Sequence, residues 1–482
     1  MANLNEEGTI IDIKSERLPE RTNFMEWYNA LLHLAEIAEK SYPVKGTFIW
    51  MPYGLGMMKK ITGIVDVELK KIGVKEVLFP LFVTMDFAQK NDKWFNGFKE
   101  EAFYIDGKEL LLRPTGEPAM YPIFSEWARQ GKLPIRIYQT VSSFRNESKT
   151  THSLIRDREI TFWHEIHTAH KTVEEARHEA DMHRKMYSYI WNNVLNIPDI
   201  VVSKPKYEIF AGADSAFEFY TILPDGRLLE NGSVNNLGQS YAKKFDVCYT
   251  NENGSKEYAW QVCTGNGARF LAAVISIHGD DKGLVVPPKI APIHVIIVPI
   301  TKSTSSANII KEAESLRNEL ILSGIEAEID NSDITAGKKF HIWEIKGVPV
   351  RIELGEKEIS ENTYTIFRRD QNKKYKIEKS NAVKVIMDLI NKDIPKELLA
   401  KAKSIYSEKI IYVDNLDEAK AEIYKGRVAK AIWCEEKACF EKISSLGPSI
   451  EPIGSLVGET KAGKCIACAK AASNLTLFGR TY

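Results

Sequence analysis

One segment of the chain concentrates arginine, glutamate and histidine in an alternating pattern, SSFRNESKTTHSLIRDREITFWHEIHTAH. We expect two antiparallel strands joined by a loop of about ten residues, because successive side chains of a strand point to opposite faces. Arg145 and Glu147 then share one face of the first strand, and Trp163, Glu165 and His167 share one face of the second. One cleft could hold both sets. A cross-strand network of ion pairs on a solvated sheet face is the alternative.

The loop of this segment is basic, since it carries Lys149, Arg156 and Arg158. Guanidinium groups form bidentate hydrogen bonds with phosphate oxygens and stay charged at all ordinary pH values. An arginine fixed on a strand, such as Arg145, is better placed for this task than one on a mobile loop. The segment therefore suits the binding of a triphosphate.

Four of the six cysteines form two close pairs near the end of the chain. Cys434 and Cys439 are separated by four residues, and Cys465 and Cys468 by two. Two such thiolate pairs are typical of a closed, tetrahedral zinc site that stabilises a small domain. Reduced free cysteines are the alternative. The remaining two cysteines lack metal spacing and are expected to be small buried hydrophobes.

Composition limits the classes of protein to which the chain could belong. The chain has 65 lysine and arginine residues and 65 aspartate and glutamate residues. This balance argues against a continuous basic surface of the kind that binds DNA. No apolar run approaches the roughly 20 residues that cross a bilayer. The start MANLNEEGTI has no basic stretch followed by an apolar one, so we expect a cytoplasmic protein without disulfides.

The 482 residues are too many for one core and indicate three domains. The first, residues 1–286, is expected to be an α+β domain with a large antiparallel sheet, and the charged segment lies within it. After the proline-rich VVPPKIAP, strands and helices alternate, which predicts an α/β domain over 287–398. Residues 399–482 would form a small α/β domain that holds the four paired cysteines.

The charged segment resembles motif 2 of class II aminoacyl-tRNA synthetases in its prolyl-tRNA synthetase form. Other segments resemble the same family in the same order: VKGTFIWMPYGLG, RPTGEPAMYPIFSEW, LGQSYAKKFDV and HGDDKGLVVPPKIAP. Together they span almost the whole chain. The cysteine-rich tail and the final GRTY resemble the archaeal and eukaryotic-like type, in which the carboxylate of Tyr482 would reach toward the catalytic domain.

The resemblance implies that ATP, with Mg²⁺, activates proline as prolyl-adenylate, and that the prolyl group then passes to the 3′ end of tRNA(Pro). By position, Arg145 and Arg269 would be catalytic. The residues implied for ATP are Arg145, Glu147, Arg156, Glu230, Ser233 and Arg269. Those implied for the amino acid are Thr115, Glu117, Arg145, Trp163, Glu165, His167 and Asn235.

The resemblance also assigns roles outside the catalytic domain. Glu344, Arg351 and Lys357 would read bases of the anticodon, because arginine and lysine reach guanine edges and carboxylates accept from exposed amino groups. The four paired cysteines would hold a structural Zn²⁺. The expected assembly is a homodimer through the strand at 73–83, with tRNA as the macromolecular partner and neither DNA nor a membrane.

Several positions depart from the family pattern in the pocket region. Glu230, Ser233 and Asn235 stand where glutamine, threonine and histidine are usual, Thr264 replaces an aromatic residue, and Gly116 replaces serine. His152 replaces an arginine in the basic loop. Two alternatives therefore remain open: a related enzyme that activates another small amino or imino acid, and a tRNA-binding paralog without catalysis.

Overall fold

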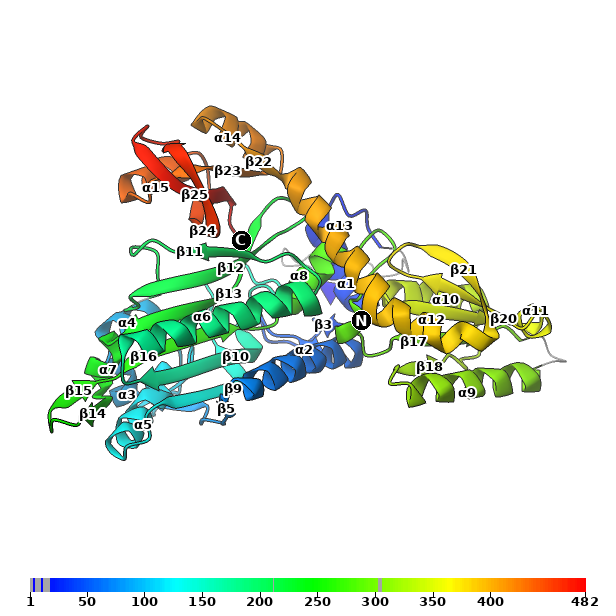
Figure 1. Cartoon of the computed structure of the whole chain (residues 1–482), viewed down its shortest axis with the longest axis horizontal. Coiled ribbons are helices and arrows are strands. Elements are labelled where there is room, and N and C mark those ends of the chain that lie inside the picture. Colours follow the sequence, from blue (N-terminus) through cyan, green and yellow to red (C-terminus); the bar gives the residue numbers. More distant parts are fainter. Residues whose placement is uncertain (1–2, 5–9, 12–17, 211, 302–305) are drawn as a thin grey trace.

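The computed structural model describes residues 3–4, 10–11, 18–210, 212–301 and 306–482. Figure 1 shows a large sheet covered by helices, a second α/β unit beside it and a small C-terminal unit at the far edge of the sheet. Within the described residues, no helix is both long enough and apolar enough to span a membrane.

An 11-stranded sheet forms the centre of the molecule. Its strands pair antiparallel except for the parallel pairs β5–β9 and β22–β23, so the expected antiparallel sheet is confirmed. In spatial order the strands are β22 (Ile410–Tyr412), β23 (Val428–Trp433), β25 (Ala471–Arg480), β24 (Ile450–Lys464), β11 (Ile200–Ser203), β12 (Ser215–Ile222), β13 (Leu228–Gly238), β16 (Trp260–Asn266), β10 (Glu159–His170), β9 (Ile135–Phe144) and β5 (Lys75–Glu76).

Long helices cover the face of the sheet turned to the viewer in Figure 1. They are α2 (Pro52–Lys71), α6 (Val173–Tyr189) and α8 (Arg269–His278), while α1 (Phe24–Leu34) lies beyond the end of the sheet near α13 (Ile394–Lys409). The sequence pattern predicts a helix from Met57 to about Lys71, but α2 begins earlier. Pro52 occupies its first turn, where proline needs no hydrogen bond. The expected capping box of Thr172 and Glu175 opens α6.

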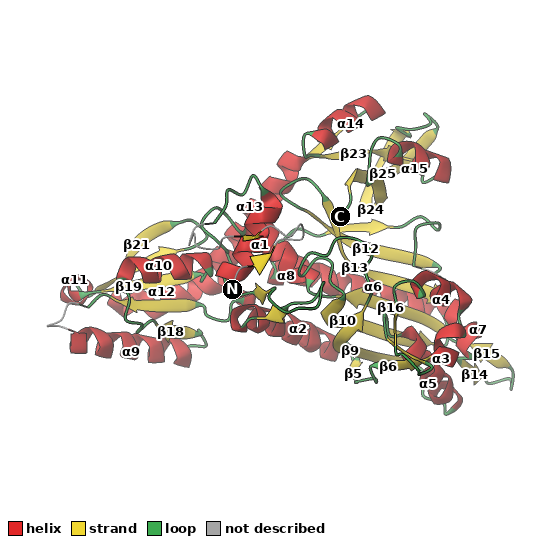
Figure 2. Cartoon of the chain, turned by 180° about the vertical axis from the view of Figure 1, so that it is seen from behind, coloured by secondary structure: helices red, strands yellow, loops and turns green. Residues whose placement is uncertain are grey.

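Short helices and hairpins lie over the opposite face, which Figure 2 shows from behind. They are α3 (Met85–Gln89), α4 (Asp92–Phe98), α5 (Glu117–Arg129), α7 (Ser240–Phe245), β6 (Phe82–Thr84), β7 (Phe103–Tyr104), β8 (Leu110–Leu112), β14 (Cys248–Thr250) and β15 (Lys256–Tyr258). Shorter elements complete this region: β1 (Asn3–Leu4), β2 (Ile10–Ile11), β3 (Ala38–Glu39), β4 (Ile49–Trp50), and the helical turns Ile190–Val194 and Pro288–Ile290.

Two expectations for this region were wrong. The segment 73–83 does not form one strand, because Pro80 lies in an irregular stretch between the short strands β5 and β6. The pattern of residues 110–283 predicts a succession of strands with few helices, of which 172–190 is the clear one, but helices α5 and α8 also stand in this region. Helix α8 is buried along almost its whole length, and a mostly apolar run of this kind is hard to distinguish from a buried strand in the sequence.

The second unit is a five-stranded mixed sheet of order β18-β17-β19-β20-β21, as expected for an α/β domain. Its strands are β17 (Val295–Pro299), β18 (Ala327–Ile329), β19 (Val350–Leu354), β20 (Thr363–Arg368) and β21 (Lys373–Glu378). Its helices are α9 (Ser306–Leu322), α10 (Ala336–Ile345), α11 (Glu356–Ser360) and α12 (Ala382–Asp388), with short turns at Lys379–Asn381 and Leu389–Asp393. Separate apolar clusters form on the two faces of this sheet.

Helix α13 (Ile394–Lys409) leads from this unit to the C-terminal one, which contains α14 (Leu416–Tyr424) and α15 (Lys437–Ser444). The C-terminal strands have their own apolar core but extend the catalytic sheet, because β24 pairs with β11. That pairing is limited to Val202 with Leu456 and Ser203 with Ser455. The C-terminal unit is thus joined to the catalytic sheet by a short strand contact.

Candidate active site

A cavity of about 290 Å³ opens on the sheet face that carries the short helices. Its walls come from the strands β10, β12, β13 and β16, from the start of α5 and from two loops. The lining residues are Phe98, Thr115, Glu117, Arg145, Trp163, Glu165, Glu208, Ile209, Phe210, Glu218, Glu230, Ser233, Asn235, Cys263, Thr264 and Gly265. Eight of the predicted substrate residues therefore meet in one place: Thr115, Glu117, Arg145, Trp163, Glu165, Glu230, Ser233 and Asn235.

Arg145 lies just beyond the end of β9 rather than on the strand, but its backbone continues to pair with Arg158 at 2.8 Å. Its guanidinium lies between the rings of Phe98 and Trp163, 5.4 and 5.3 Å from their centroids. Burial lowers the pKa of Arg145 from its ordinary value, which leaves the group charged. A buried cation held between two rings is well placed to meet an anionic substrate group.

Glu165 is the centre of a buried polar cluster on β10. Its carboxylate accepts hydrogen bonds from Gly116 N (3.0 Å), Gln139 Nε2 (2.6 Å) and Trp163 Nε1 (3.0 Å), and lies 3.3 Å from His167 Nε2. Burial alone would raise the pKa of Glu165, but these hydrogen bonds and the charge of His167 lower it to about 2. The cluster fixes one wall of the cavity.

His167 completes this wall from behind and is fully buried. Burial lowers the pKa of His167, but the Glu165 carboxylate outweighs this effect and raises it above the ordinary value. The hydroxyl of Tyr121 lies 3.0 Å from Nδ1, so both ring nitrogens have partners suited to the imidazolium form. His167 does not line the cavity itself and supports Glu165 instead.

Thr115 and Glu117 stand at the start of α5, next to this wall. The Thr115 hydroxyl accepts a hydrogen bond from Trp94 Nε1 at 2.9 Å, which fixes the loop before the helix. Glu117 is 3% exposed, and its Oε2 atom makes no hydrogen bond to any described residue. A buried carboxylate oxygen without a partner is costly, so this atom is suited to a cationic group of a ligand.

Two departures from the family pattern have local explanations in the structure. A Cβ atom at Gly116 would lie 2.5 Å from Glu165 Oε1, so a serine there would displace the carboxylate. The hydroxyl of Thr264 points away from the cavity, where it meets Tyr187 OH at 3.0 Å and Ile166 N at 3.2 Å. The Thr264 hydroxyl thus has its hydrogen-bonding partners within the protein.

The floor of the cavity combines Ser233, Asn235 and Cys263. Asn235 Nδ2 donates to Ser233 Oγ at 2.9 Å and lies 3.8 Å from Cys263 Sγ. Burial raises the pKa of the Cys263 thiol well above its ordinary value, so the group is a neutral thiol. The substitution of asparagine for the usual histidine is thus accommodated by a hydrogen bond within the floor.

Arg269 begins α8 and binds the edge of β13. Its Nε donates to Ile155 O at 2.8 Å and its Nη1 to Glu230 O at 2.5 Å, while the Glu230 carboxylate lies 3.7 Å away. Nearby, Arg156 Nη2 donates to the backbone oxygen of Tyr482 at 2.9 Å, and its guanidinium lies over the Tyr482 ring. The expected approach of Tyr482 to the catalytic domain is confirmed.

Some predicted residues do not reach the cavity, and some lining residues were missed. Glu147 lies outside the lining, and its backbone oxygen accepts from Arg158. The missed residues Glu208, Phe210 and Glu218 come from β12 and the loop before it. This loop has no charged repeat or helical period that could have marked it, and only the fold brings it over the site.

The four cysteines of the C-terminal unit come together as expected. Their sulfur atoms all lie within 4.8 Å of one another, with Cys434 3.4 Å from Cys439 and 3.8 Å from Cys468. A tetrahedral site with Zn–S bonds of about 2.3 Å places its sulfur atoms about 3.8 Å apart. The geometry fits a four-thiolate metal site.

The residues expected to read the anticodon lie in the second unit. Arg351 on β19 is 3% exposed, and its guanidinium lies 4.2 and 4.3 Å from the ring centroids of Phe340 and Phe367. It pairs with Glu353 at 2.9 Å and lies 3.8 Å from Glu344. Lys357 lies on α11, which follows β19 directly. Glu344 and Arg351 therefore lie together near the start of β19, whereas Lys357 follows the other end of this strand.

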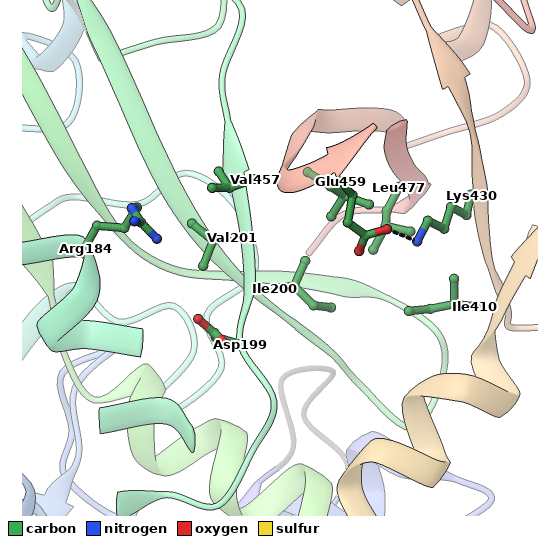
Figure 3. Close-up of a pocket in the computed structure, with 10 residues that line it drawn as sticks. Arg184, Asp199, Ile200, Val201, Ile410, Lys430, Val457, Glu459 and Leu477 are labelled. Carbon is green, nitrogen blue, oxygen red and sulfur yellow. Dashed lines mark hydrogen bonds and ion pairs between the residues drawn. The ribbon is translucent and has the colours of Figure 1, made fainter. Parts of the chain in front are cut away.

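A second cavity, of about 190 Å³, lies where the C-terminal unit meets the catalytic sheet. Figure 3 shows Ile200, Val201 and Val457 in its apolar centre and the ion pair of Lys430 with Glu459 on one side. It opens because β11 and β24 pair at only two positions. None of the residues predicted for a site lines it.

Comparisons with known proteins agree with this architecture. A family model described as tRNA synthetase class II core domain (G, H, P, S and T) matches residues 98–278, and one for an anticodon binding domain matches 294–389. A model described as Prolyl-tRNA synthetase, C-terminal, matches residues 416–482.

Full-length relatives and a solved structure give the same result. The proline-tRNA ligase of Methanopyrus kandleri is 36% identical over 96% of this chain and 97% of its own length. The proline-tRNA ligase of Thermococcus kodakarensis is 37% identical over 97% of this chain and 99% of its own length. Giardia lamblia prolyl-tRNA synthetase in complex with prolyl-adenylate superposes with a TM-score of 0.91 at 30% identity, covering 96% of this chain and 99% of that one. The chain therefore belongs to the prolyl-tRNA synthetase family of class II aminoacyl-tRNA synthetases.

Proposed function

We propose that the chain activates proline with ATP to give prolyl-adenylate and transfers the prolyl group to the 3′ end of tRNA(Pro). The observation that carries this proposal is the cavity that both Glu117, with an unpartnered carboxylate oxygen, and the Arg145 guanidinium line. An amino acid has one cationic and one anionic end, and these two groups match them. The proline-tRNA ligases to which the chain is similar support the choice of substrate.

The secondary ammonium of proline would donate to Glu117 and to Thr115, while its ring would pack against Trp163 and the floor at Cys263. Glu165 and His167 hold Trp163 in place through the bond between Trp163 Nε1 and Glu165. Because Glu165 has its hydrogen-bonding partners within the protein, it is better suited to shaping the wall than to receiving the substrate charge. Asn235 would take the place next to the substrate that histidine has in the family pattern.

In the first step, a carboxylate oxygen of proline attacks the α-phosphorus of ATP and pyrophosphate leaves. Arg145 would neutralise the charge that develops between the carboxylate and the α-phosphate. Arg269 and Arg156 would bind the outer phosphates, and Glu147 would help to fix the adenosine. In the second step, a hydroxyl of the terminal ribose of tRNA attacks the carbonyl carbon, and AMP leaves.

Magnesium accompanies ATP, and the cavity offers oxygen ligands for it. Burial and the neighbouring Glu230 carboxylate raise the pKa of Glu218 to about 7. A divalent cation between these carboxylates would offset their repulsion, and Ser233 adds a hydroxyl oxygen. We therefore propose Glu218, Glu230 and Ser233 as the residues that would hold Mg²⁺, which neutralises phosphate charge when bound.

The decisive experiment is pyrophosphate exchange with purified protein, supplied in turn with proline, alanine and cysteine. We expect proline to give the highest kcat/KM. Exchange that depends on another amino acid would support the related-enzyme alternative, and the complete absence of ATP turnover would support the non-catalytic one.

For tRNA recognition we propose that Glu344, Arg351 and Lys357 contact anticodon bases. The support is their place in the unit that matches an anticodon binding domain, together with the 3.8 Å distance between Arg351 and Glu344. Arg351 is stacked between two rings, which hold its guanidinium in one orientation. We also propose that the protein works in the cytoplasm, where thiols such as these four cysteines stay reduced.

We propose that the four cysteines bind one structural Zn²⁺ per chain. Replacing the buried Cys465 with serine is expected to abolish stoichiometric zinc and to unfold the C-terminal unit, because such sites contribute about 10 kcal/mol or more to folding. Zinc content by mass spectrometry of metals and thermal unfolding would measure this. Cys248, a buried cysteine outside the cluster, gives the control Cys248→Ser, which should keep its zinc. Wild-type protein with less than about one zinc per chain would contradict the proposal.

We propose a homodimer that forms through residues 73–83. Leu78 is 79% exposed and Phe82 is 52% exposed in this segment, and large exposed apolar side chains in one place mark interaction surfaces. Leu78→Glu is expected to weaken self-association at least about tenfold, as measured by light scattering after size exclusion. Leu322 on α9 is 88% exposed, so Leu322→Glu is a matched control that should remain dimeric. A wild-type monomer would overturn the proposal.

A further inference from the structure

The loop of residues 204–210, between β11 and β12, forms one wall of the active-site cavity. Three consecutive residues, Glu208, Ile209 and Phe210, line that cavity. The Phe210 ring stacks on Tyr241 with a centroid distance of 6.2 Å and an interplanar angle of 11°. The position of this loop therefore decides the shape of the proposed proline pocket.

Tyr207, in the same loop, contacts the C-terminal unit. Its hydroxyl donates to the backbone oxygen of Glu435 at 3.0 Å, and its ring meets Phe440 edge-on at 5.7 Å. Glu435 directly follows Cys434, and Phe440 directly follows Cys439. Both contacts of Tyr207 are therefore next to cysteines of the four-sulfur cluster.

The C-terminal side of this contact is held in a defined conformation. Glu435 has a φ of 62°, in the left-handed region, and its carboxylate accepts a hydrogen bond from Ser455 Oγ. Ser455 itself pairs with Ser203 at the end of β11, immediately before the loop. The cysteine cluster, Glu435 and the base of the loop thus form a continuous chain of contacts.

Two further observations place the loop against the same unit. A Cβ atom at Gly454 would lie 2.7 Å from the backbone oxygen of Ser203, so β24 presses on the start of the loop. The strand pairing that supports this approach is confined to two positions, and the cavity of Figure 3 opens beside it. Because β11 and β24 pair at only two positions, side-chain contacts such as that of Tyr207 largely position the loop.

We propose that Tyr207 is a positioning residue that couples the cysteine-held C-terminal unit to the wall of the proline pocket. It keeps Glu208, Ile209 and Phe210 in the conformation that binds the amino acid. This inference rests on the proposed activation of proline. When only part of the population has the competent loop, the apparent affinity falls by that fraction, while the chemistry of the bound state is unchanged.

The test compares Tyr207→Ala and Tyr207→Phe with wild type as full-length protein. For Tyr207→Ala we expect KM for proline to rise about tenfold, with kcat and KM for ATP within about twofold. Tyr207→Phe keeps the ring contact and is expected to raise KM for proline about threefold. Tyr249→Phe is the matched control, because its hydroxyl also donates to a backbone oxygen, that of Lys171, at 3.1 Å.

Hydrogen–deuterium exchange of amides 206–210 gives a readout that is independent of activity. We expect faster exchange in Tyr207→Ala, and faster exchange in wild type after zinc chelation. Zinc chelation should increase the rate of amide exchange less in Tyr207→Ala than in wild type, because the contact between the loop and the C-terminal unit is already lost in this variant. Unchanged exchange and an unchanged KM for proline in Tyr207→Ala would overturn the inference. Wild type without proline-dependent pyrophosphate exchange would overturn the proposed function instead, while amide exchange would still decide whether Tyr207 positions the loop.

Discussion

Replacing Arg145 with glutamine is expected to lower kcat/KM for proline-dependent pyrophosphate exchange by about a thousandfold. Glutamine is shorter than arginine and carries no charge to neutralise the developing negative charge at the α-phosphate. Arg145→Lys should recover part of the loss, because it restores the charge without the bidentate geometry or the planar group between Phe98 and Trp163. Steady-state exchange kinetics with varied ATP and proline would measure both effects.

The control for this prediction is Arg129→Gln on α5. Arg129 forms an exposed ion pair with Asp246 at 2.7 Å, at the far end of the helix that Glu117 begins. Exposed ion pairs contribute little to stability, so this variant should keep activity within about twofold of wild type. Arg145→Gln protein that retains more than about a tenth of wild-type activity would show that this arginine does not stabilise the transition state.

Replacing Glu117 with glutamine is expected to raise KM for proline about a hundredfold, because a charge-assisted hydrogen bond to the substrate ammonium is lost. KM for ATP should stay nearly constant, because Glu117 is proposed to bind the amino acid and not the nucleotide. The melting temperature should be equal to or above that of wild type, because the substitution removes a buried charge whose Oε2 atom has no partner among the described residues. Exchange kinetics and thermal unfolding would check the two parts.

Glu126→Gln gives the matched control for this substitution. Glu126 lies on the same helix but is exposed, and its carboxylate accepts from Gln130 at 2.8 Å. The Glu126→Gln variant should change neither KM for proline nor the melting temperature measurably. If Glu117→Gln lowered stability and left KM for proline unchanged, Glu117 would be a structural group and the proposed mode of binding proline would fail.

The alternation of side chains along β10 was predictable from the sequence because it is a local property of an extended strand. Trp163 and Glu165 face the cavity, with His167 behind them, while His164 and Ile166 face the helices, as expected. Phe162 has a φ of 54° and lies at a bulge, yet it still packs on the helix side against Trp50. The bulge inserts one extra residue into β10, so that Ile160 and Trp163, three positions apart, pair with Ser143 and Val141 on the same face of β9.

Positions at the ends of strands were harder to predict. Arg145 and Glu147 have the spacing of two residues on one strand face, but β9 ends at Phe144. Beyond that point the backbone turns, so only Arg145 enters the cavity. Hydrogen bonds to Arg158, which is distant in sequence, set this turn, and no local pattern encodes them.

The charged segment by itself predicted a cleft suited to a phosphate-bearing substrate, because the types and alternation of its residues are properties of the sequence. The spacing of the paired cysteines likewise predicted a four-sulfur cluster, and the four sulfur atoms lie together. Only the tertiary structure decided that Glu117 is left with an unpartnered oxygen and that Gly116 must lack a side chain. It also placed the loop at Tyr207 between the cysteine cluster and the pocket. These contacts join residues that are distant in sequence, and no local pattern specifies which of them meet.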